Sequence, residues 1–315
     1  RAMLPELVKI LSGPGCPVCV TPMNVLDAAI EAVHEEGVVL TTFGDMMRVP
    51  GGRQSLMEAR SEGADVRVMY SPMDALKLAQ EDPQKQVVFF ATGFETTSPL
   101  IAGTVFAAAR QGVGNFSVFS SHKTVPLALK ALLDSPDVKV DGFILPGHVS
   151  TIIGLKPYEF VAAEYGKPAV VTGFEAHEII LGITMIIRQI TAGEAKVENA
   201  YPSVVETAGN PKAMALLNEV FEPVDAYWRG IGVLPGTGLM LREKYRAFDA
   251  IARFHPETTG VPEPELCSCG DILRGVKVPI ECPLFGTGCT PESPVGPCMV
   301  SAEGSCAAYY KYGER

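Results

Sequence analysis

Short apolar runs alternate with amphipathic segments along most of the chain. The runs are typical of buried strands, and the segments between them carry apolar residues at helical spacing, as Leu26, Ile30 and Val33 do. Strands that alternate with helices predict an α/β fold with parallel sheets covered by helices on both faces. Strands are predicted at 4–11, 38–43, 66–70, 87–91, 116–119, 142–145 and 169–172, and helices at 23–36, 54–62, 72–80, 125–133 and 211–219, with two more ending near Arg110 and Ile190.

The alternation divides the chain into three predicted domains. Gly112-Val113-Gly114 is the predicted seam between two parallel-sheet α/β domains, 1–114 and 115–250. The remainder, 251–315, is predicted to be a small loop-rich domain, and it holds six of the eight cysteines. It is rich in glycine and proline and poor in large apolar residues, so it has little with which to build a core of its own. Disulfides, zinc or an iron–sulfur cluster are the candidates for holding it.

Composition and charge remove several classes of function. The chain has 315 residues, 47% hydrophobic and 20% charged, which is ordinary for a globular protein. Its net charge is −10 and it has no basic block, which argues against a nucleic-acid partner. No apolar run reaches about 18 residues and no secretory segment opens the chain, so no membrane span is predicted and the cytoplasm is the expected location. In a reducing cytosol, clustered cysteines more often bind metal or perform catalysis than form structural disulfides.

Cys16-Pro17-Val18-Cys19 is a C-x-x-C motif at the predicted strand-to-helix turn before the helix at 23–36. A helix N-terminus lowers the pKa of a thiol, so this pair is expected to form thiolates near neutral pH. Such thiolates suit disulfide exchange or ligation of a soft metal such as iron. The alternative is two buried cysteines packed under a turn. The redox interpretation is favoured because C-x-x-C at a helix start is an established redox geometry.

Polar residues follow several other predicted strands, at the edge where open parallel sheets build their sites. Glu95 and His148 are candidate catalytic groups, although the first lies in an ordinary capping segment and a lone histidine is often structural. Asp45 and Arg48 lie in a loop bounded by glycine and proline, where they either bind a ligand or partner or pair with each other. The glycine-rich turns form neither G-x-G-x-x-G nor a P-loop, so no nucleotide site is indicated.

The six cysteines of the tail have the spacing C-x-C-x12-C-x6-C-x8-C-x7-C. Closed zinc ribbons usually show two C-x-x-C knuckles, which this spacing lacks. Irregular spacing with many glycines and prolines favours an iron–sulfur cluster held by four thiolates over zinc, and zinc over structural disulfides. Four ligands leave two cysteines spare, enough for a redox disulfide beside the cluster.

Five blocks of sequence resemble the HypD family, the maturation factors of nickel–iron hydrogenases. They lie in the same order as in that family and extend over nearly the whole chain. The resemblance implies two α/β domains and a smaller domain with a 4Fe–4S cluster in surroundings like those of ferredoxin:thioredoxin reductase. The blocks are 13–22, 42–51, 93–97, 142–154 and 267–306.

The resemblance also implies roles for the tail cysteines. The family pattern C-x12-C-x6-C-x16-C corresponds here to four of them, which become the expected cluster ligands. Cys267 and Cys298 are then the spare pair, expected beside the cluster as a redox couple. The expected ligands are Cys269, Cys282, Cys289 and Cys306.

By this resemblance, the chain holds an iron together with a HypC-type chaperone while two cyanides and one carbon monoxide are attached. A HypE-type protein delivers the cyanide, and the iron unit passes to the hydrogenase large subunit. Cys16 and Cys19 match the family's central thiol pair near the iron, and Glu95, His148 and Asp45 are expected to be polar neighbours or partner contacts. Whether the chain turns over as an enzyme stays open. The alternatives are a cluster-driven thiol/disulfide reductase and a zinc-stabilised interaction protein.

One family feature is missing. The family has a Cys-Gly-Thr-His block that precedes the point where this sequence begins, and its cysteine is a leading candidate ligand of the iron. The sequence opens at Arg1, in the middle of the pattern. A truncated sequence is therefore expected, rather than a protein with a defective iron site.

Overall fold

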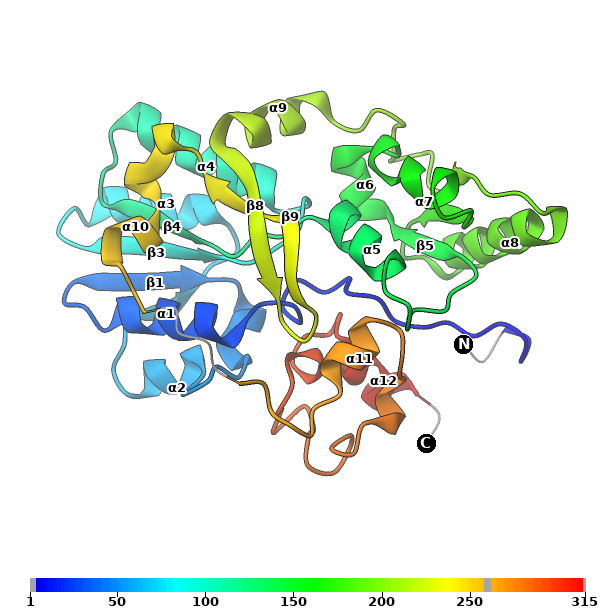
Figure 1. Cartoon of the computed structure of the whole chain (residues 1–315). Helices are drawn as coiled ribbons and strands as arrows, with labels where there is room; N and C mark the ends of the chain where they lie inside the picture. The colour runs from blue at the N-terminus through cyan, green and yellow to red at the C-terminus, as the bar shows by residue number, and fades with distance from the viewer. Residues whose placement is uncertain (1–3, 258–261, 314–315) are drawn as a thin grey trace.

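Two parallel sheets lie at opposite sides of the molecule, and an antiparallel hairpin runs between them (Figure 1). The computed structural model describes residues 4–257 and 262–313. The α/β class predicted from the sequence is confirmed. The first sheet has the order β2-β1-β3-β4, with β1 Val38–Thr42, β2 Val66–Val68, β3 Gln86–Ala91 and β4 Phe116–Ser120; the second has the order β5-β6-β7, with β5 Phe143–Pro146, β6 Ala169–Thr172 and β7 Val197–Asn199; the hairpin is β8 Phe221–Trp228 and β9 Gly232–Leu241.

Helices cover both faces of the first sheet, which explains why its strands are apolar throughout. On the central strand β3, Val88 and Phe90 belong to the core shared with α1 and α2, while Val87 and Phe89 belong to the core under α3 and α4. The alternation follows from the two-residue period of a strand. The helices are α1 Met23–Val33, α2 Leu56–Ser61, α3 Pro72–Glu81 and α4 Ser98–Gln111.

The second sheet is smaller and has its own core, which includes Leu145, Tyr158 and Val171. The helices that follow its strands are grouped around it on one side of the molecule (Figure 1). Among the helices within the described residues, none is both long and apolar enough to cross a membrane. The helical segments of this half are α5 Val125–Leu133, α6 Gly147–Ile153, η2 Lys156–Tyr158, α7 Glu159–Ala163 and α8 Ala176–Ala192.

The boundary predicted at 114 does not separate the two sheets. β4 lies after it in the chain but pairs in parallel with β3, so the change of sheet comes after Ser120. The predicted second domain, 115–250, also does not form one unit around the second sheet. After β7 the chain returns through α9 Pro211–Val220, which packs on α4, and through η3 Glu243–Phe248 and α10 Ala250–Phe254, which pack on β4. Local periodicity marks a strand but does not indicate which sheet it joins.

The strand predicted at 4–11 is wrong. This apolar segment pairs with no strand in the described parts of the chain, and Leu7 is 95% exposed. Leu11 and Ser12 instead lie against the tail at Gly275, where a Cβ would stand 3.3 Å from the Ser12 carbonyl oxygen. In Figure 1 the segment passes between the second sheet and the tail. Without a neighbouring strand, an apolar run cannot form the backbone hydrogen bonds of a sheet.

The tail has short elements and shares a core with the first domain. Cys269, Cys289, Cys298 and Cys306 are buried in the same apolar cluster as residues of α1 and the first sheet. The tail is therefore packed against the first domain and does not stand as a separate body. Its elements are α11 Cys269–Leu273, η4 Pro279–Glu281, η5 Pro297–Met299 and α12 Ser305–Tyr312.

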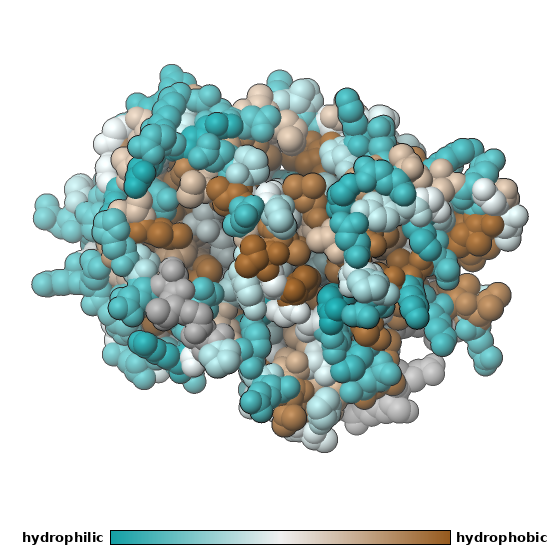
Figure 2. Space-filling model, viewed as in Figure 1, coloured by the Kyte–Doolittle hydropathy of each residue, from teal (hydrophilic) through white to brown (hydrophobic). Residues whose placement is uncertain are grey.

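The β8–β9 hairpin extends from the first domain towards the tail, and its tip lies beside α11 (Figure 1). Seen from the same side, apolar residues gather over the hairpin (Figure 2). Tyr227, Val233 and Met240 of the hairpin are exposed. The sequence-based prediction of parallel sheets missed this antiparallel element, although residues 221–228 alternate between inward and outward positions as a half-buried strand does.

Candidate thiol and metal site

All six tail cysteines line one narrow apolar cavity. They come from α11, η5, α12 and the loops between them, so five separate pieces of chain deliver sulfur to the same place. The remaining lining is apolar, from Ile272, Leu284, Phe285 and Met299. The structure therefore gathers the six cysteines that the sequence singled out. They are Cys267, Cys269, Cys282, Cys289, Cys298 and Cys306.

A glycine allows two of these thiols to approach the backbone. A Cβ at Gly296 would lie 2.7 Å from Cys267 Sγ and 3.4 Å from Cys269 Sγ. At the first distance, a side chain at position 296 would force the Cys267 thiol to shift. The absence of a side chain there leaves room for the sulfur atoms.

Backbone groups contact two of the sulfur atoms. The Val295 N–H donates to Cys289 Sγ at 3.3 Å, and the Cys282 thiol lies 3.9 Å from the Leu266 carbonyl oxygen. Hydrogen bonds to cluster sulfurs tune the reduction potential of an iron–sulfur centre. Six thiols in an apolar cavity are a soft donor set that fits iron–sulfur ligation, and the four expected ligands are among them. No three His, Cys, Asp or Glu side chains of the described ranges are arranged to hold a single metal ion.

The C-x-x-C motif lies directly against the tail. Cys16 and Cys19 are 3% and 0% exposed, so the motif is buried. The Cys19 N–H donates to Cys16 Sγ at 3.2 Å, and the Cys19 thiol lies 4.0 Å from the Pro297 carbonyl oxygen, 278 residues further along the chain. The fold thus brings the motif to the residue that precedes Cys298.

Neighbouring thiols connect the motif to the cavity. Cys19 interacts with Cys298, which in turn interacts with Cys269, and Cys269 interacts with Cys267. The predicted redox pair, Cys267 and Cys298, is thus linked through an expected cluster ligand. All eight cysteines carry free thiols in this structure.

The lowered thiol pKa predicted for the motif is wrong for Cys19. Burial raises the pKa of its thiol well above the ordinary value, and the hydrogen bond with Cys16 raises it further. Helix α1 begins only at Met23, so Cys19 lies outside the first helical turn, where the helix dipole acts most strongly.

Asp45 and Arg48 both hold the tail and do not pair with each other. They lie on η1 Gly44–Arg48. The Ser301 hydroxyl donates to Asp45 Oδ2 at 2.8 Å, and the Arg48 guanidinium donates to the carbonyl oxygens of Pro291 and Val300, each at 3.3 Å. These contacts brace the loop that carries Cys298.

Glu95 and His148 are not part of the cysteine cavity. Glu95 is buried after β3; its Oε1 accepts the Val125 N–H at 3.0 Å, and its Oε2 has no partner. His148 is exposed on α6, with its ring edge-on to Phe174 at 4.8 Å. Burial and the charge of Asp45 raise the pKa of Glu303 in the tail. His148 lies close enough to oppose part of this rise, at the rim between the second domain and the tail.

We expect Glu95 to make stability fall as the pH rises. Burial raises the pKa of its carboxyl from 4.5 to about 7, so folding favours the protonated form. The stabilisation is present below pH 4.5 and is lost as the pH rises through 7. Glu95→Gln keeps the acceptor for the Val125 N–H. The substitution should raise the free energy of unfolding by about 3 kcal/mol more at pH 8 than at pH 4. Urea unfolding at the two pH values measures this. Glu81→Gln on the exposed end of α3 is the control, and equal pH profiles for wild type and Glu95→Gln would contradict the prediction.

Three buried polar residues were not among the site residues predicted from the sequence. His122 is 1% exposed at the end of β4, Tyr158 is 0% exposed near Glu95, and Arg229 is 1% exposed at the hairpin tip. Each has a buried polar side-chain atom that finds no hydrogen-bond partner within residues 4–257 and 262–313. The signal available for Arg229 was its position beside Trp228, the one tryptophan of the sequence, and before Gly230-Ile231-Gly232.

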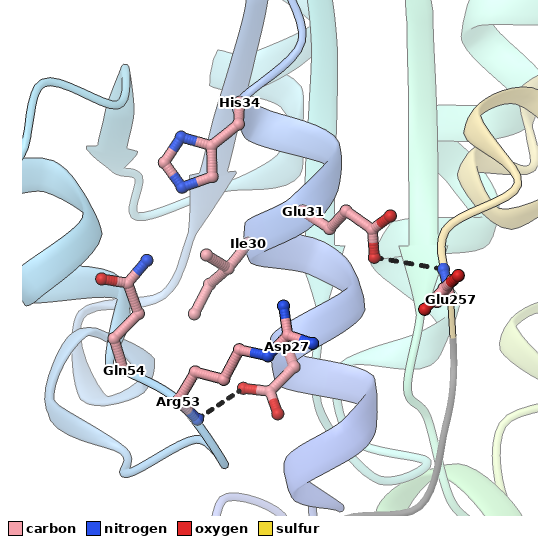
Figure 3. Close-up of a pocket in the computed structure, with 7 residues that line it drawn as sticks. All are labelled: Asp27, Ile30, Glu31, His34, Arg53, Gln54 and Glu257. Atoms are coloured by element: carbon pink, nitrogen blue, oxygen red, sulfur yellow. Dashed lines mark hydrogen bonds between the residues drawn. The ribbon is translucent and has the colours of Figure 1, made fainter.

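A second pocket lies apart from the cysteines, on the outer side of α1 (Figure 3). Two of its acidic side chains are already engaged in structural contacts. Asp27 accepts the N–H groups of Gly52 and Arg53, and Glu31 accepts the N–H of Glu257 at 3.1 Å. Figure 3 shows the contacts of Asp27 with Arg53 and of Glu31 with Glu257, which connect α1 to the neighbouring loop and to the segment after α10.

Two parallel α/β sheets, a buried C-x-x-C motif and a cavity with six thiols together define a cysteine-centred protein suited to soft metals or thiol exchange. Comparison with known proteins gives the family. The family model described as "HypD: Hydrogenase formation hypA family" matches residues 1–313. The chain belongs to the HypD family.

Relatives from several bacteria agree. The hydrogenase maturation factor HypD of Rhodobacter capsulatus is 49% identical over 311 residues, which cover 97% of this chain and 82% of that protein. The HypD proteins of Cupriavidus necator and Escherichia coli are 47% and 46% identical, each covering 99% of this chain and 84% of the relative. The resemblance inferred from the sequence blocks is confirmed.

Proposed function

We propose that this protein is a scaffold and redox protein in the assembly of the Fe(CN)2CO unit of nickel–iron hydrogenases. Its family membership supports a role in hydrogenase maturation, since its relatives are named for that process. The observation that carries the finer proposal is the thiol chain from Cys19 through Cys298 to the tail cavity. Such a chain joins a place for binding iron to a place for storing electrons.

In this proposal the tail cavity holds a 4Fe–4S cluster, which supplies single electrons when bound. The apolar lining keeps water from the sulfur atoms, and the Val295 N–H donates to one of them. Gly296 leaves room for the sulfur atoms. The residues proposed to hold the cluster are Cys269, Cys282, Cys289 and Cys306.

The thiols outside this set are positioned for exchange. When Cys16 and Cys19 are joined as a disulfide, attack by the Cys298 thiolate on Cys19 forms a Cys19–Cys298 bond and releases Cys16 as a thiolate. The number of disulfide bonds and of electrons is unchanged. The released thiolate is a suitable ligand for the cargo iron, since soft thiolates support iron with strong-field ligands.

The partners belong to the same proposal. A HypC-type chaperone shares the iron, a HypE-type protein delivers cyanide, and the hydrogenase large subunit receives the finished unit. The test is infrared spectroscopy of the anaerobic complex with the HypC-type partner. Bands of bound cyanide and carbon monoxide are expected, and a complex that carries iron without them would contradict the proposal.

A cluster-driven disulfide reductase is the second candidate, favoured by the contact between Cys19 and Cys298. Burial of both motif cysteines argues against it, because a disulfide on another protein does not reach them in this conformation. Catalytic reduction of a substrate disulfide without any maturation partner would favour the reductase. Zinc analysis decides the third candidate: one zinc and no colour would indicate a zinc-stabilised interaction protein.

Replacing Gly296 with Ala should sharply reduce the iron content. The new Cβ would stand 2.7 Å from Cys267 Sγ and displace the thiols of the cavity. Iron per protein and visible absorption after anaerobic reconstitution measure the effect. The control is Gly114→Ala, where a Cβ meets no atom within 4 Å. Full iron content in Gly296→Ala would contradict the geometry of the cavity.

A further inference from the structure

Arg229 is buried where the C-x-x-C turn, the hairpin and the tail meet. It follows β8 at the hairpin tip, and its own N–H donates to the carbonyl oxygen of Val20, the residue after the motif, at 3.0 Å. On its other side, Gly230 packs on Gly270, the residue after Cys269. A Cβ on Gly270 would lie 2.1 Å from the Gly230 carbonyl oxygen, so the two backbones are in direct contact.

The guanidinium of Arg229 is only partly satisfied. Its side chain is 2% exposed. Nε donates to Glu263 Oε2 at 3.0 Å, and Nη1 donates to the Pro50 carbonyl oxygen at 3.0 Å, but Nη2 is buried and has no partner among the described residues. A buried cation with an unused donor is costly unless negative charge lies nearby.

Glu263 compensates the positive charge of Arg229 only in part. Glu263 is 32% exposed, so water screens part of its charge. Arg229 lies within electrostatic reach of Cys267, although the neighbouring Cys269 and burial raise the pKa of that thiol. Other cations of the tail are differently placed: Arg274 and Lys277 are 26% and 42% exposed and both pair with Asp271.

We propose that Arg229 is the buried positive charge beside the cysteine cavity and that this charge sets the reduction potential of the redox group held there. This inference rests on the proposed function, in that the redox group is the cluster. Each electron added to a site lined by thiolates increases its negative charge, and a nearby fixed cation stabilises the reduced state in a medium of low dielectric. Arg229 is therefore a positioning residue that acts through electrostatics.

The test compares two substitutions that change the local charge in opposite directions. Arg229→Gln removes the cation and should make the cluster about tenfold harder to reduce, a midpoint lower by about 59 mV for one electron. Glu263→Gln leaves the cation uncompensated and should move the midpoint upwards. Arg229→Lys keeps the charge and should restore most of the wild-type value. Redox titration of the reconstituted protein, monitored by visible absorption, measures the midpoint potentials of all three variants.

The control is Arg242→Gln, at the other end of the hairpin, where the exposed guanidinium pairs with Glu222. A purely structural role for Arg229 would lower the melting temperature of both charge variants without opposite shifts of the midpoint. Equal midpoints, or shifts of the same sign, would overturn the inference.

A wild-type protein that binds no cluster would contradict the proposed function but still leave the inference testable. The cysteines are then equilibrated with dithiothreitol and counted as thiol or disulfide. Arg229→Gln should hold a larger fraction of disulfide than wild type, and Glu263→Gln a smaller one. Identical fractions in the three proteins would overturn the role of Arg229.

Discussion

Cys289→Ala should abolish the cluster and its brown colour, with iron content falling at least about tenfold. Cys289 is 7% exposed, lines the cavity and accepts the Val295 N–H. Alanine removes the sulfur and leaves that N–H without an acceptor in an apolar setting. Three thiolates then remain of the four proposed to hold the cluster. Iron analysis and visible absorption after anaerobic reconstitution measure the loss.

The matched control removes a sulfur from the other end of the thiol chain. Cys16 is also buried, at 3% exposed, but it does not line the tail cavity. Cys16→Ala should therefore keep the iron and colour of the wild type. A colourless Cys16→Ala protein, or a fully loaded Cys289→Ala protein, would show that the ligands are not those proposed.

Cys19→Ala should reduce hydrogenase activation in cells to the background level while the cluster is retained. Cys19 is the one motif residue whose thiol interacts with both Cys16 and Cys298, so its removal interrupts the chain of thiols at its middle. Truncating a fully buried side chain also costs some stability, but a cysteine is small and the loss is limited. Hydrogenase activity in a strain that carries only the variant measures the effect.

Two further variants separate chemistry from packing. Val18→Ala removes a larger buried apolar side chain from the same turn, where Val18 is 8% exposed, and leaves every sulfur in place. Activation should persist in this control. Normal activation by Cys19→Ala would refute the role of the motif. A loss in both variants would assign the effect to packing of the turn.

Much of the secondary structure was predictable because the strands are apolar and the helices amphipathic. β6 and α5 have the bounds expected from the sequence, and α9 exceeds its prediction by one residue. The strand predicted at 4–11 is wrong, although it rests on the same apolar pattern as the strands that were predicted correctly. An apolar run indicates burial, yet a strand also needs a partner for its backbone, and none is adjacent to this segment.

The candidate site divides in the same way. The cysteine spacing indicated a shared site in the tail, and the six thiols do line one cavity. The Cys19 thiol did not follow its local pattern, because burial against the tail raises its pKa. Glu95 and His148 both follow predicted strands, but one is buried beside α5 and the other is exposed on α6.

The sequence by itself determined the α/β class, the family and the residues that carry sulfur, since these depend on local periodicity and on ordered blocks of residue types. Only the tertiary structure decided that β4 belongs to the first sheet and that the C-x-x-C turn packs on Pro297. It also decided that Arg229 is buried where this turn, the hairpin and the tail meet. A periodic pattern specifies which face of an element is buried but not what covers it. Contacts between residues more than 200 positions apart, and the desolvation that follows from them, exist only once the chain has folded.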